Sequence, residues 1–322
     1  ATGKNWKFPQ SVASADPRPD GVVLWTRVVN SALSDVATVP AGTDVTIGLY
    51  ISSSDKNKAL VGTQTDLKGR IVAKQPVPAF SDFDGTARHK VCGLEPSTVY
   101  YYQFIAGDVR SKIGRFKTAP AKRADVSQMK FAFISCQDWS INHWAGYSEL
   151  AKQDDLDFFI HLGDYIYETV GEAFQTGLVE SRHTALSLPD GAYKNGTSGA
   201  KYAISLDDYR YLYKQYRTDP RLQAMHERFP MIAIWDDHEF SDDCWGDRST
   251  YDNGTFNATT GLYTAKSDGT LTVTVGECVI SGGQFQNVSA APVSPYTVTL
   301  NGGAALATSS TENLYFHRDA FA

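Results

Sequence analysis

The chain has 322 residues, 42% of them hydrophobic, and a formal net charge of −6 at pH 7. This length is enough for one large core or two moderate ones, and it favours two domains. The acidic balance argues against sequence-specific nucleic-acid binding, because that role needs clustered Lys and Arg. No stretch approaches the ~20 apolar residues of a membrane-spanning helix, so we expect no membrane span.

Several features favour export. The first ten residues, ATGKNWKFPQ, contain no signal-peptide core, so a signal is either absent or already removed. The tail is rich in Thr, Ser, Gly and Asn, and four sequons fit a secreted protein: Asn195, Asn253, Asn257 and Asn287. The four cysteines are too few for a disulfide scaffold, although one bridge is possible. We therefore expect a secreted or periplasmic protein.

Residues 1–119 have the pattern of an all-β domain. Short apolar runs separated by turn residues predict a β-sandwich of about seven strands. The runs lie at 22–28, 45–52, 69–74, 87–94, 98–106 and 114–119. The stretch GLEPSTVYYYQF resembles the E–F corner of fibronectin type III domains. We interpret this domain as a packing platform without chemistry of its own.

An α/β domain is expected at 129–247, after a polar linker at 120–128. Two apolar runs, Phe131–Ile134 and Phe158–Leu162, flank an amphipathic stretch at 143–152, which is the pattern of a βαβ unit. Such units form parallel sheets that are covered on both faces. The sequence therefore predicts a doubly covered parallel sheet that begins in this region.

The pattern continues beyond an irregular stretch at 169–204. Ser205 and Asp208 have capping-box spacing, which predicts a helix to about Arg217, and Pro220 suits the first turn of a second helix. MIAIW, at 231–235, reads as a third buried strand. Residues 248–322 are Thr- and Val-rich with Gly, which predicts a β-rich insertion or C-terminal segment.

Polar clusters follow all three strands of the expected parallel sheet. Because the carboxyl ends of parallel strands meet at one edge, these clusters should lie side by side and form a metal site. The clusters are Cys136 with Asp138, Asp164 with Tyr167, and Asp236 through Glu239.

The ligand types narrow the choice of metal. Thiolate and phenolate together favour Fe³⁺, whereas carboxylates suit Ca²⁺, Mg²⁺ or Mn²⁺. Asp164 has two carboxylate oxygens and so is able to bridge two ions. A two-metal site of this kind clamps phosphoryl oxygens and activates a water molecule for attack.

Five sequence blocks resemble PhoD-type alkaline phosphatases and phosphodiesterases, which belong to the calcineurin-like metallophosphoesterase superfamily and are related to purple acid phosphatases. The blocks are FPQSVASADPRPDGVVLWTRV, FAFISCQDW, HLGDYIYE, SLDDYRYLYKQYRTDPRLQ and AIWDDHEFSDDCW, in that order. The resemblance implies an exported metallophosphoesterase-like α/β domain behind a fibronectin-like one. The implied activity is hydrolysis of phosphate monoesters or diesters, including a phospholipase D-like reaction, by a metal-bound hydroxide.

The resemblance also implies roles for individual residues. Cys136, Asp164 and Tyr167 would bind Fe³⁺, and Asp138 is a further candidate metal ligand. Asp164 would bridge to a second ion, which Asp237 would help to hold. That ion would be Ca²⁺, with Mn²⁺, Mg²⁺ or Zn²⁺ as alternatives. In the same site, His238 would orient the phosphate or protonate the leaving oxygen.

One departure from the family pattern leaves alternatives open. After His238 the sequence contains one further histidine, His317, and no GDxH motif. The sequence therefore contains only about half of the expected metal ligands. The remaining ligands would lie on a second polypeptide or in further chain. Alternatively, the protein is a non-catalytic extracellular binding or adhesive protein on a degenerate phosphatase scaffold. A metal-independent hydrolase that uses Cys136 is disfavoured, because no histidine stands at a convincing base position beside it.

Overall fold

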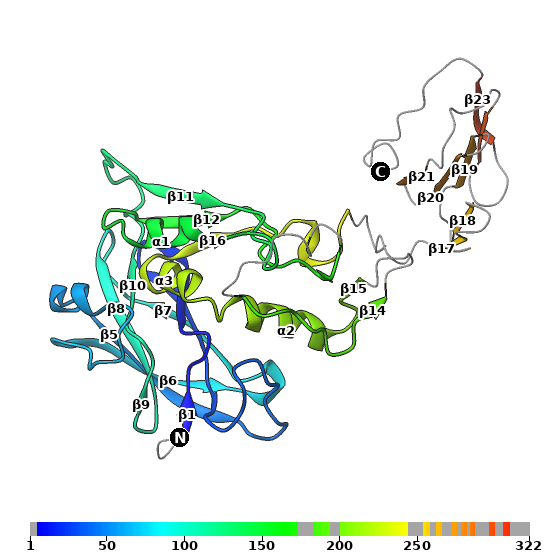
Figure 1. Cartoon of the computed structure of the whole chain (residues 1–322). Coiled ribbons are helices and arrows are strands. Elements are labelled where there is room, and N and C mark those ends of the chain that lie inside the picture. Colours follow the sequence, from blue (N-terminus) through cyan, green and yellow to red (C-terminus); the bar gives the residue numbers. More distant parts are fainter. Residues whose placement is uncertain are drawn as a thin grey trace.

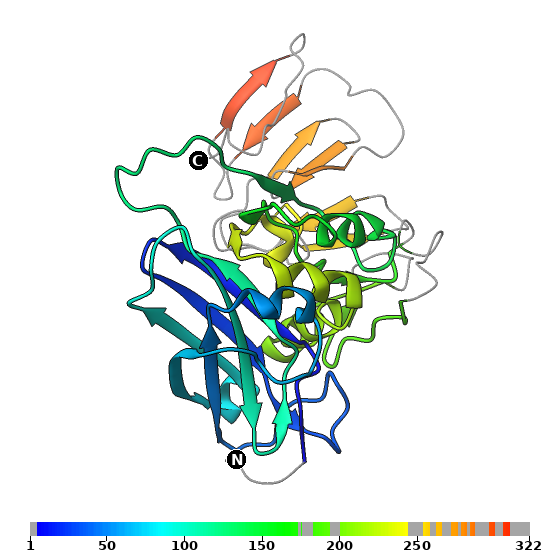
Figure 2. The same ribbon diagram turned by 90° about the vertical axis from the view of Figure 1, so that its left-hand side faces the viewer.

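The structure is a computed structural model that describes residues 5–172, 175, 183–193 and 200–243. It also describes the backbone of short strands between 254 and 309. Figure 1 shows the arrangement of the elements, and Figure 2 shows the same ribbon turned by 90°. In the described part of the chain, no helix has the length and apolar character needed to cross a membrane.

The N-terminal part consists of two sheets around one hydrophobic core. The core residues Leu24, Leu49 and Phe104 are fully buried between the sheets. One sheet contains β2 (Val12–Arg18), β3 (Gly21–Arg27) and β7 (Thr86–Cys92), and the other has the order β10 (Gly114–Lys117), β8 (Val99–Ala106), β5 (Val45–Ser52) and β6 (Ile71–Ala79). These strands confirm the expected all-β organisation. The shorter elements here are β1 (Trp6–Lys7), β4 (Val29–Asn30), β9 (Val109–Arg110), η1 (Asp55–Leu60) and η2 (Ser81–Phe83).

The turn before β8 is closed by a tyrosine. The hydroxyl of Tyr100 accepts a hydrogen bond from the backbone N–H of Glu95 at 3.0 Å. The Tyr100 ring stacks on Phe116 in the core, with ring centroids 5.5 Å apart. This contact has the form of a tyrosine corner, in which a buried tyrosine holds the connection between two strands of a sandwich.

Three parallel strands extend one sheet of the sandwich. They are β11 (Phe131–Ile134), β12 (Phe158–His161) and β16 (Met231–Ala233). Strand β16 also pairs in parallel with β2, where Met231 lies opposite Ala15. The result is a six-stranded sheet in the order β11-β12-β16-β2-β3-β7. The parallel strands and the N-terminal strands therefore share one sheet, although no regular element spans 118–130.

Helices cover one face of the parallel strands. They are α1 (Ala145–Ala151), α2 (Leu206–Tyr216) and α3 (Pro220–Arg228). Both predicted helix starts are confirmed. The Ser205 side chain accepts from the Asp208 N–H at 3.1 Å, and Asp219 caps α3 with Pro220 in its first turn. Phe159 of β12 is fully buried in the core on this face.

The opposite face of these strands is exposed. Phe133 of β11 is 68% exposed, Ile232 of β16 is 43% exposed, and Trp235 just after β16 is 70% exposed. The predictions of a doubly covered sheet and of a buried third strand are therefore wrong for the described residues. Both faces of these strands carry apolar residues, so the sequence does not distinguish them, but the described helices pack on one face alone.

The remaining strands lie beyond β12. The stretch 169–204, predicted to be irregular, contributes a small antiparallel sheet of β13 (Thr169–Val170), β15 (Lys201–Tyr202) and β14 (Ala192–Tyr193). The later segment contains β17 (Gly254–Asn257), β18 (Leu262–Ala265), β19 (Thr272–Val275), β20 (Cys278–Ser281), β21 (Gln284–Gln286), β22 (Tyr296–Thr299) and β23 (Ala305–Ser309). Figure 1 shows these last strands in yellow to red.

Candidate metal centre

The loops after β11 and β12 are held against each other by backbone hydrogen bonds. The Cys136 N–H donates to the carbonyl of Gly163 at 3.3 Å, and the Gln137 N–H donates to that of Asp164 at 3.0 Å. Cys136 and Asp164 both have left-handed backbone conformations, with φ of 56° and 55°. Such conformations are rare for residues other than glycine and cluster at functional sites. The strand ends therefore present the two predicted ligands side by side.

Gly163 lets the third strand end come equally close. Its φ is +104°, and a Cβ atom at this position would lie 2.5 Å from the backbone nitrogen of Asp236. Only glycine suits both the positive φ and the contact distance. The close approach brings the loop after β16, with η4 (Asp237–Glu239), against the loop that carries Asp164.

Asp164 has the surroundings of a metal-bridging carboxylate. Its Oδ2 lies 3.4 Å from the Cys136 sulfur and 3.4 Å from the Tyr167 hydroxyl, both of which donate to it. Its Oδ1 is buried and has no hydrogen-bond partner. Burial raises the pKa of Asp164, and the nearby His238 opposes this shift only in part. A buried carboxylate oxygen without a partner is costly, and a cation at Oδ1 would remove that cost.

Further ligand atoms gather around the Asp164 carboxylate. Ligand atoms of Asp164, Asp237 and His238 all lie within 4.8 Å of one another. A second group of the same kind contains Asp237, Asp242 and Asp243. Asp237 belongs to both groups, so the arrangement suits cations on either side of it. The thiol, phenol and carboxylate donors present here fit the metals that the sequence predicts.

The His238 ring is held by Glu168 and Tyr167. Its Nδ1 lies 2.7 Å from Oε2 of Glu168, and its ring stacks on Tyr167 with the centroids 4.0 Å apart. Burial alone would lower the pKa of His238, but the hydrogen bond to Glu168 and the charges of Glu168 and Asp164 raise it to about 9. Glu168 is fully buried, and its second oxygen accepts from the Asp242 N–H at 2.6 Å.

Asp138 has other partners in this structure. Its Oδ1 accepts from the N–H groups of Ser140 and Ile141 at 2.6 and 3.2 Å, and its Oδ2 accepts from the Gln175 amide at 2.8 Å. Burial raises its pKa despite these bonds. The structure brings Cys136, Asp164, Tyr167, Asp237 and His238 together, whereas the role of Asp138 as a ligand stays a prediction.

Two carboxylates hold the site in place, of which Glu168 was not predicted and Glu239 was predicted only as a member of the Asp236–Glu239 cluster. Glu168 orients His238, as described above. Glu239 accepts hydrogen bonds from the Asp164 N–H at 3.0 Å and from the Asp236 N–H at 2.6 Å. Glu168 lies in the block HLGDYIYE and Glu239 in the block AIWDDHEFSDDCW, so membership of these blocks is the signal that the sequence contained.

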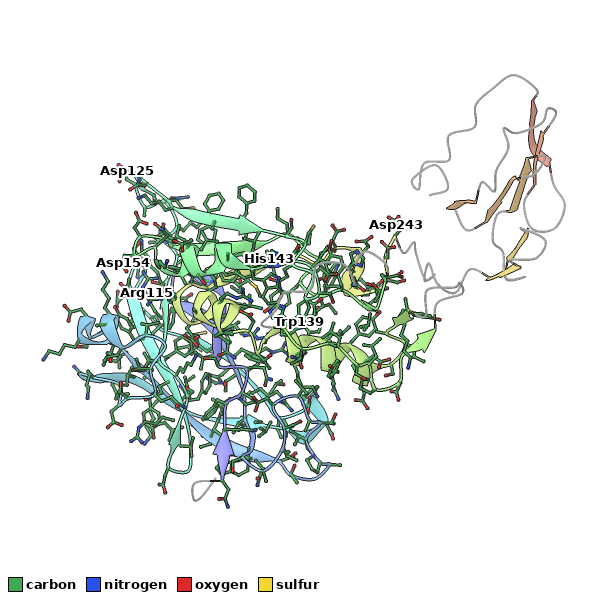
Figure 3. The ribbon with its side chains drawn as sticks, viewed as in Figure 1. Arg115, Asp125, Trp139, His143, Asp154 and Asp243 are labelled. Carbon is green, nitrogen blue, oxygen red and sulfur yellow. The ribbon has the colours of Figure 1, made fainter. Side chains whose placement is uncertain are left out.

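The loop after β16, which contains Asp236, Asp237, Asp242 and Asp243, lies at one end of the α/β part of the molecule. Figure 3 shows Asp243, the last described residue of this loop, far from Arg115 and Asp154 at the other end of the strands. Trp139 lies between these ends, and its ring stacks on His183 at 3.6 Å. His183 in turn contacts Asp219 at 2.7 Å. This contact ties the described part of the 169–204 stretch to α3.

Comparisons with known proteins agree with this geometry. Residues 131–268 match the family "PhoD-like phosphatase", and residues 1–120 match "PhoD-like phosphatase, N-terminal domain". Alkaline phosphatase D of Bacillus subtilis (strain 168) is 36% identical over 237 residues, which cover 73% of this chain and 36% of that protein. A solved structure of PhoD aligns with a TM-score of 0.60 at 33% identity, over 74% of this chain and 40% of that one. The chain thus spans well under half the length of these relatives.

Proposed function

The chain belongs to the PhoD-like phosphatase family, and we propose that it takes part in the metal-dependent hydrolysis of phosphate monoesters or diesters. The observation that carries the proposal is the Asp164 carboxylate. One of its oxygens receives the thiol of Cys136 and the phenol of Tyr167, and the other is buried without a partner. Asp237 and His238 offer ligand atoms within 4.8 Å of a carboxylate oxygen of Asp164.

The proposed roles follow from these positions. Cys136, Asp164 and Tyr167 would hold Fe³⁺, while Asp164 and Asp237 would hold a second ion such as Ca²⁺. When bound, these ions would supply Lewis acidity that stabilises negative charge on the phosphoryl oxygens. His238, held by Glu168 at 2.7 Å, is placed to donate a hydrogen bond to the phosphate or a proton to the leaving oxygen.

The exposed sheet face supports a further part of this proposal, in which additional polypeptide completes the site. Ile234 and Trp235 are 63% and 70% exposed, and they directly precede Asp236. Exposed large apolar side chains that gather in one region are typical of an interaction surface. Polypeptide that covers it would come close to Asp237 and could supply the missing metal ligands, either from a second chain or from further sequence as in the longer relatives.

Two finer aspects belong to the same proposal. The sandwich is proposed to be fibronectin type III-like, which its two sheets around one core and the Tyr100 corner support. The protein is proposed to act outside the cytoplasm, which the four sequons support. Release of glycans by an N-glycosidase from protein secreted by a eukaryotic host would test whether these sequons are accessible.

Metal content and activity test the proposed function together. Purified protein is expected to contain iron by elemental analysis, with a visible charge-transfer band that Tyr167→Phe removes. It is expected to hydrolyse p-nitrophenyl phosphate or its bis ester, and Asp164→Asn should abolish both metal binding and hydrolysis. Protein that takes up no metal and cleaves neither ester, both alone and together with the polypeptide that completes the site, would overturn the proposal. Tyr213→Phe, on α2, is a matched control that should keep the band.

A second candidate function is favoured by the exposed face itself. A non-catalytic extracellular binding protein could use Phe133 and Trp235 for adhesion while keeping the phosphatase scaffold. Mass spectrometry of the native complex separates the two candidates. A companion chain that carries histidines and restores metal binding would support the phosphoesterase, whereas stable partner binding without any metal would support the binding protein.

A further inference from the structure

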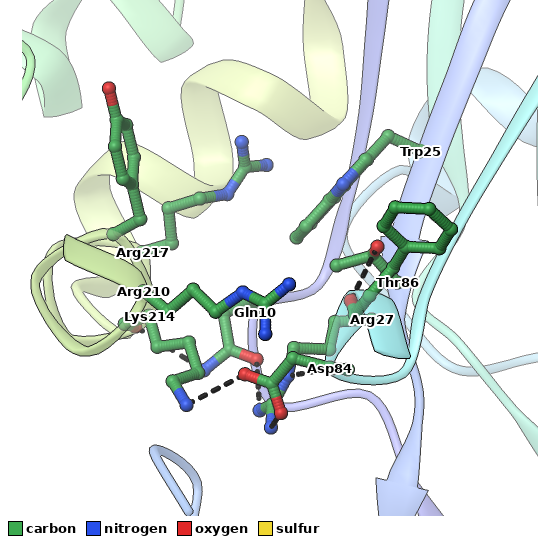
Figure 4. A pocket seen from close by; sticks show the side chains of 10 residues that line it. Gln10, Trp25, Arg27, Asp84, Thr86, Arg210, Lys214 and Arg217 are labelled. Atoms are coloured by element: carbon green, nitrogen blue, oxygen red, sulfur yellow. Dashed lines mark hydrogen bonds and ion pairs between the residues drawn. The ribbon is translucent and has the colours of Figure 1, made fainter. Parts of the chain in front are cut away.

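A cavity of about 240 Å³ lies between the sandwich and helix α2 (Figure 4). Trp25 and Arg27 of β3 line one wall together with Asp84, which follows η2. Helix α2 and the residue after it form the other wall, with Arg210 and Arg217 among the lining residues. The cavity contains none of the predicted metal ligands, so it is distinct from the candidate metal centre.

The wall formed by α2 is strongly basic. Arg210, Lys214 and Arg217 are spaced four and three residues apart, which puts them on one face of the helix. Asp84 is the single carboxylate among the residues that line the cavity, and it is already shared by two cations. Its oxygens lie 3.1 Å from the Arg27 guanidinium and 2.7 Å from the Lys214 ammonium. Within this lining, Arg210 and Arg217 therefore have no carboxylate to balance them.

Both of these guanidinium groups are held in position. The Arg217 group lies 4.1 Å from the centre of the Trp25 ring, and its Nε and one terminal nitrogen are buried without a hydrogen-bond partner. Arg210 donates to the backbone carbonyl of Asp82 at 2.7 Å, a contact that leaves its charge uncompensated. In Figure 4, both arginines extend from α2 toward the sandwich. Fixed guanidinium groups are well suited to bind oxyanions.

The helix dipole accounts for only part of this arrangement. Cations are favoured near the C-terminus of a helix, where Lys214 and Arg217 lie. Arg210 lies in the middle of α2, where the dipole has little effect, and yet it lines the same cavity. The chain as a whole carries a net charge of −6, so this local excess of positive charge is unusual within it.

Aromatic side chains line the edge of the cavity. Phe83 is 62% exposed and Tyr213 is 38% exposed, and both line it. Phe80, which is 44% exposed, meets Phe83 edge to face with ring centroids 6.5 Å apart. Exposed aromatic rings next to unbalanced cations offer an apolar surface and an anion site together.

We propose that this cavity binds a small aromatic oxyanion. The anionic group contacts Arg210 and Arg217, and the ring packs against Phe83 and Tyr213. The two anion chemistries that fit are a phosphonate or phosphate group and a carboxylate. The proposal does not depend on phosphoesterase activity, because no residue of the cavity belongs to the metal centre.

Calorimetric titration of the full chain, stripped of metal, tests the proposal with three probes. These are phenylphosphonate, which has no ester bond to hydrolyse, benzoate and inorganic phosphate. We expect phenylphosphonate or benzoate to bind about tenfold more tightly than phosphate because of the ring contact. The tighter of the two ring-bearing probes identifies the anion chemistry. No binding of either at millimolar concentration, or equal binding of all three probes, would overturn the proposal.

Variants locate the binding site. Arg210→Gln and Arg217→Gln are each expected to weaken phenylphosphonate about tenfold or more, because each removes charge-assisted hydrogen bonds. Asp164→Asn, which alters the metal centre, and Lys152→Gln, an exposed ion-pair residue of the α1 C-cap, should leave the affinity unchanged. Thermal unfolding checks that each variant is folded. If Arg217→Gln is not folded, Arg217→Lys replaces it as the test of Arg217. Unchanged affinity in the folded arginine variants would place any binding elsewhere and overturn the assignment.

Discussion

The imidazole Nδ1 of His238 lies 2.7 Å from Oε2 of Glu168, which is fully buried and itself held by the Asp242 N–H. A carboxylate in this position sets the ring orientation and therefore the direction in which Nε2 points. Glu168 contacts no proposed substrate atom, so it is a positioning residue whose effect passes through His238.

Glu168→Gln is expected to lower kcat by about 10- to 100-fold, as is typical when the hydrogen-bond partner of a functional histidine is changed. KM should change little, since the proposed metal ligands Asp164 and Asp237 are intact. Steady-state kinetics on p-nitrophenyl phosphate, in whichever assembly is active, give both constants. Glu149→Gln, which removes an exposed ion pair with Lys152, is the control and should match the parent chain. A Glu168→Gln enzyme with the parent kcat would contradict this role.

Gly163→Ala is expected to destabilise the fold by about 2–4 kcal/mol, because it combines an unfavourable φ with a clash against the backbone of Asp236. Gly42 offers a matched control. Its φ of +76° is also positive, but an added Cβ would meet nothing within 4 Å. Gly42→Ala should therefore cost only about 1 kcal/mol from the backbone conformation. Urea unfolding of the two variants separates strain from clash, and equal losses would show that the contact with Asp236 is unimportant.

Local signals in the sequence predict the helix starts and the strand ends well. The capping box of Ser205 and Asp208 and the first-turn Pro220 act over a few residues, so their geometry is encoded where they stand. Cys136 and Asp164 could likewise be placed at one sheet edge, because parallel strands have few alternatives once the βαβ unit is recognised.

Pairing across long distances was not predictable in the same way. Met231 lies opposite Ala15, and the apolar pattern of neither strand indicates which strand it pairs with. The side on which helices pack is equally hidden, so MIAIW looked buried although Ile232 is half-exposed. Glu168 was missed because a glutamate in a polar motif looks like a solvated residue until a histidine 70 positions away is placed beside it.

The buried ion network between the sandwich and α2 should make stability depend on pH. Burial opposes ionisation of Asp84, but the hydrogen bond from Lys214 and the charge of Arg27 hold its pKa below the usual value of 3.8. A lowered pKa in the folded state means that the unfolded chain binds its proton first as the pH falls. The stabilising contribution of Asp84 is therefore complete above about pH 5 and is lost below about pH 4.

Asp84→Asn tests this dependence. At neutral pH we expect a loss of about 3–5 kcal/mol in unfolding free energy, because Arg27 and Lys214 are left buried without their carboxylate. The difference from the parent chain should shrink as the pH falls below about 4. Asp16→Asn, which removes an exposed pair with Arg18, should cost less than about 1 kcal/mol at any pH. A constant Asp84→Asn difference from pH 7 to pH 3 would show that the charge of Asp84 does not cause the effect.

The exposed sheet face predicts opposite outcomes for two phenylalanines on neighbouring strands. Phe133 of β11 is 68% exposed, whereas Phe159 of β12 is fully buried. Phe159→Thr is expected to cost about 3–5 kcal/mol in unfolding free energy, as large-to-small changes in a core do. Phe133→Thr keeps a good strand residue and should change stability by less than about 0.5 kcal/mol in the isolated chain. It should instead weaken association with any companion chain that restores metal binding, measured by sedimentation of the mixture. If Phe133→Thr destabilises the isolated chain as much as Phe159→Thr does, Phe133 is buried in the isolated chain, and this face is not free for a partner.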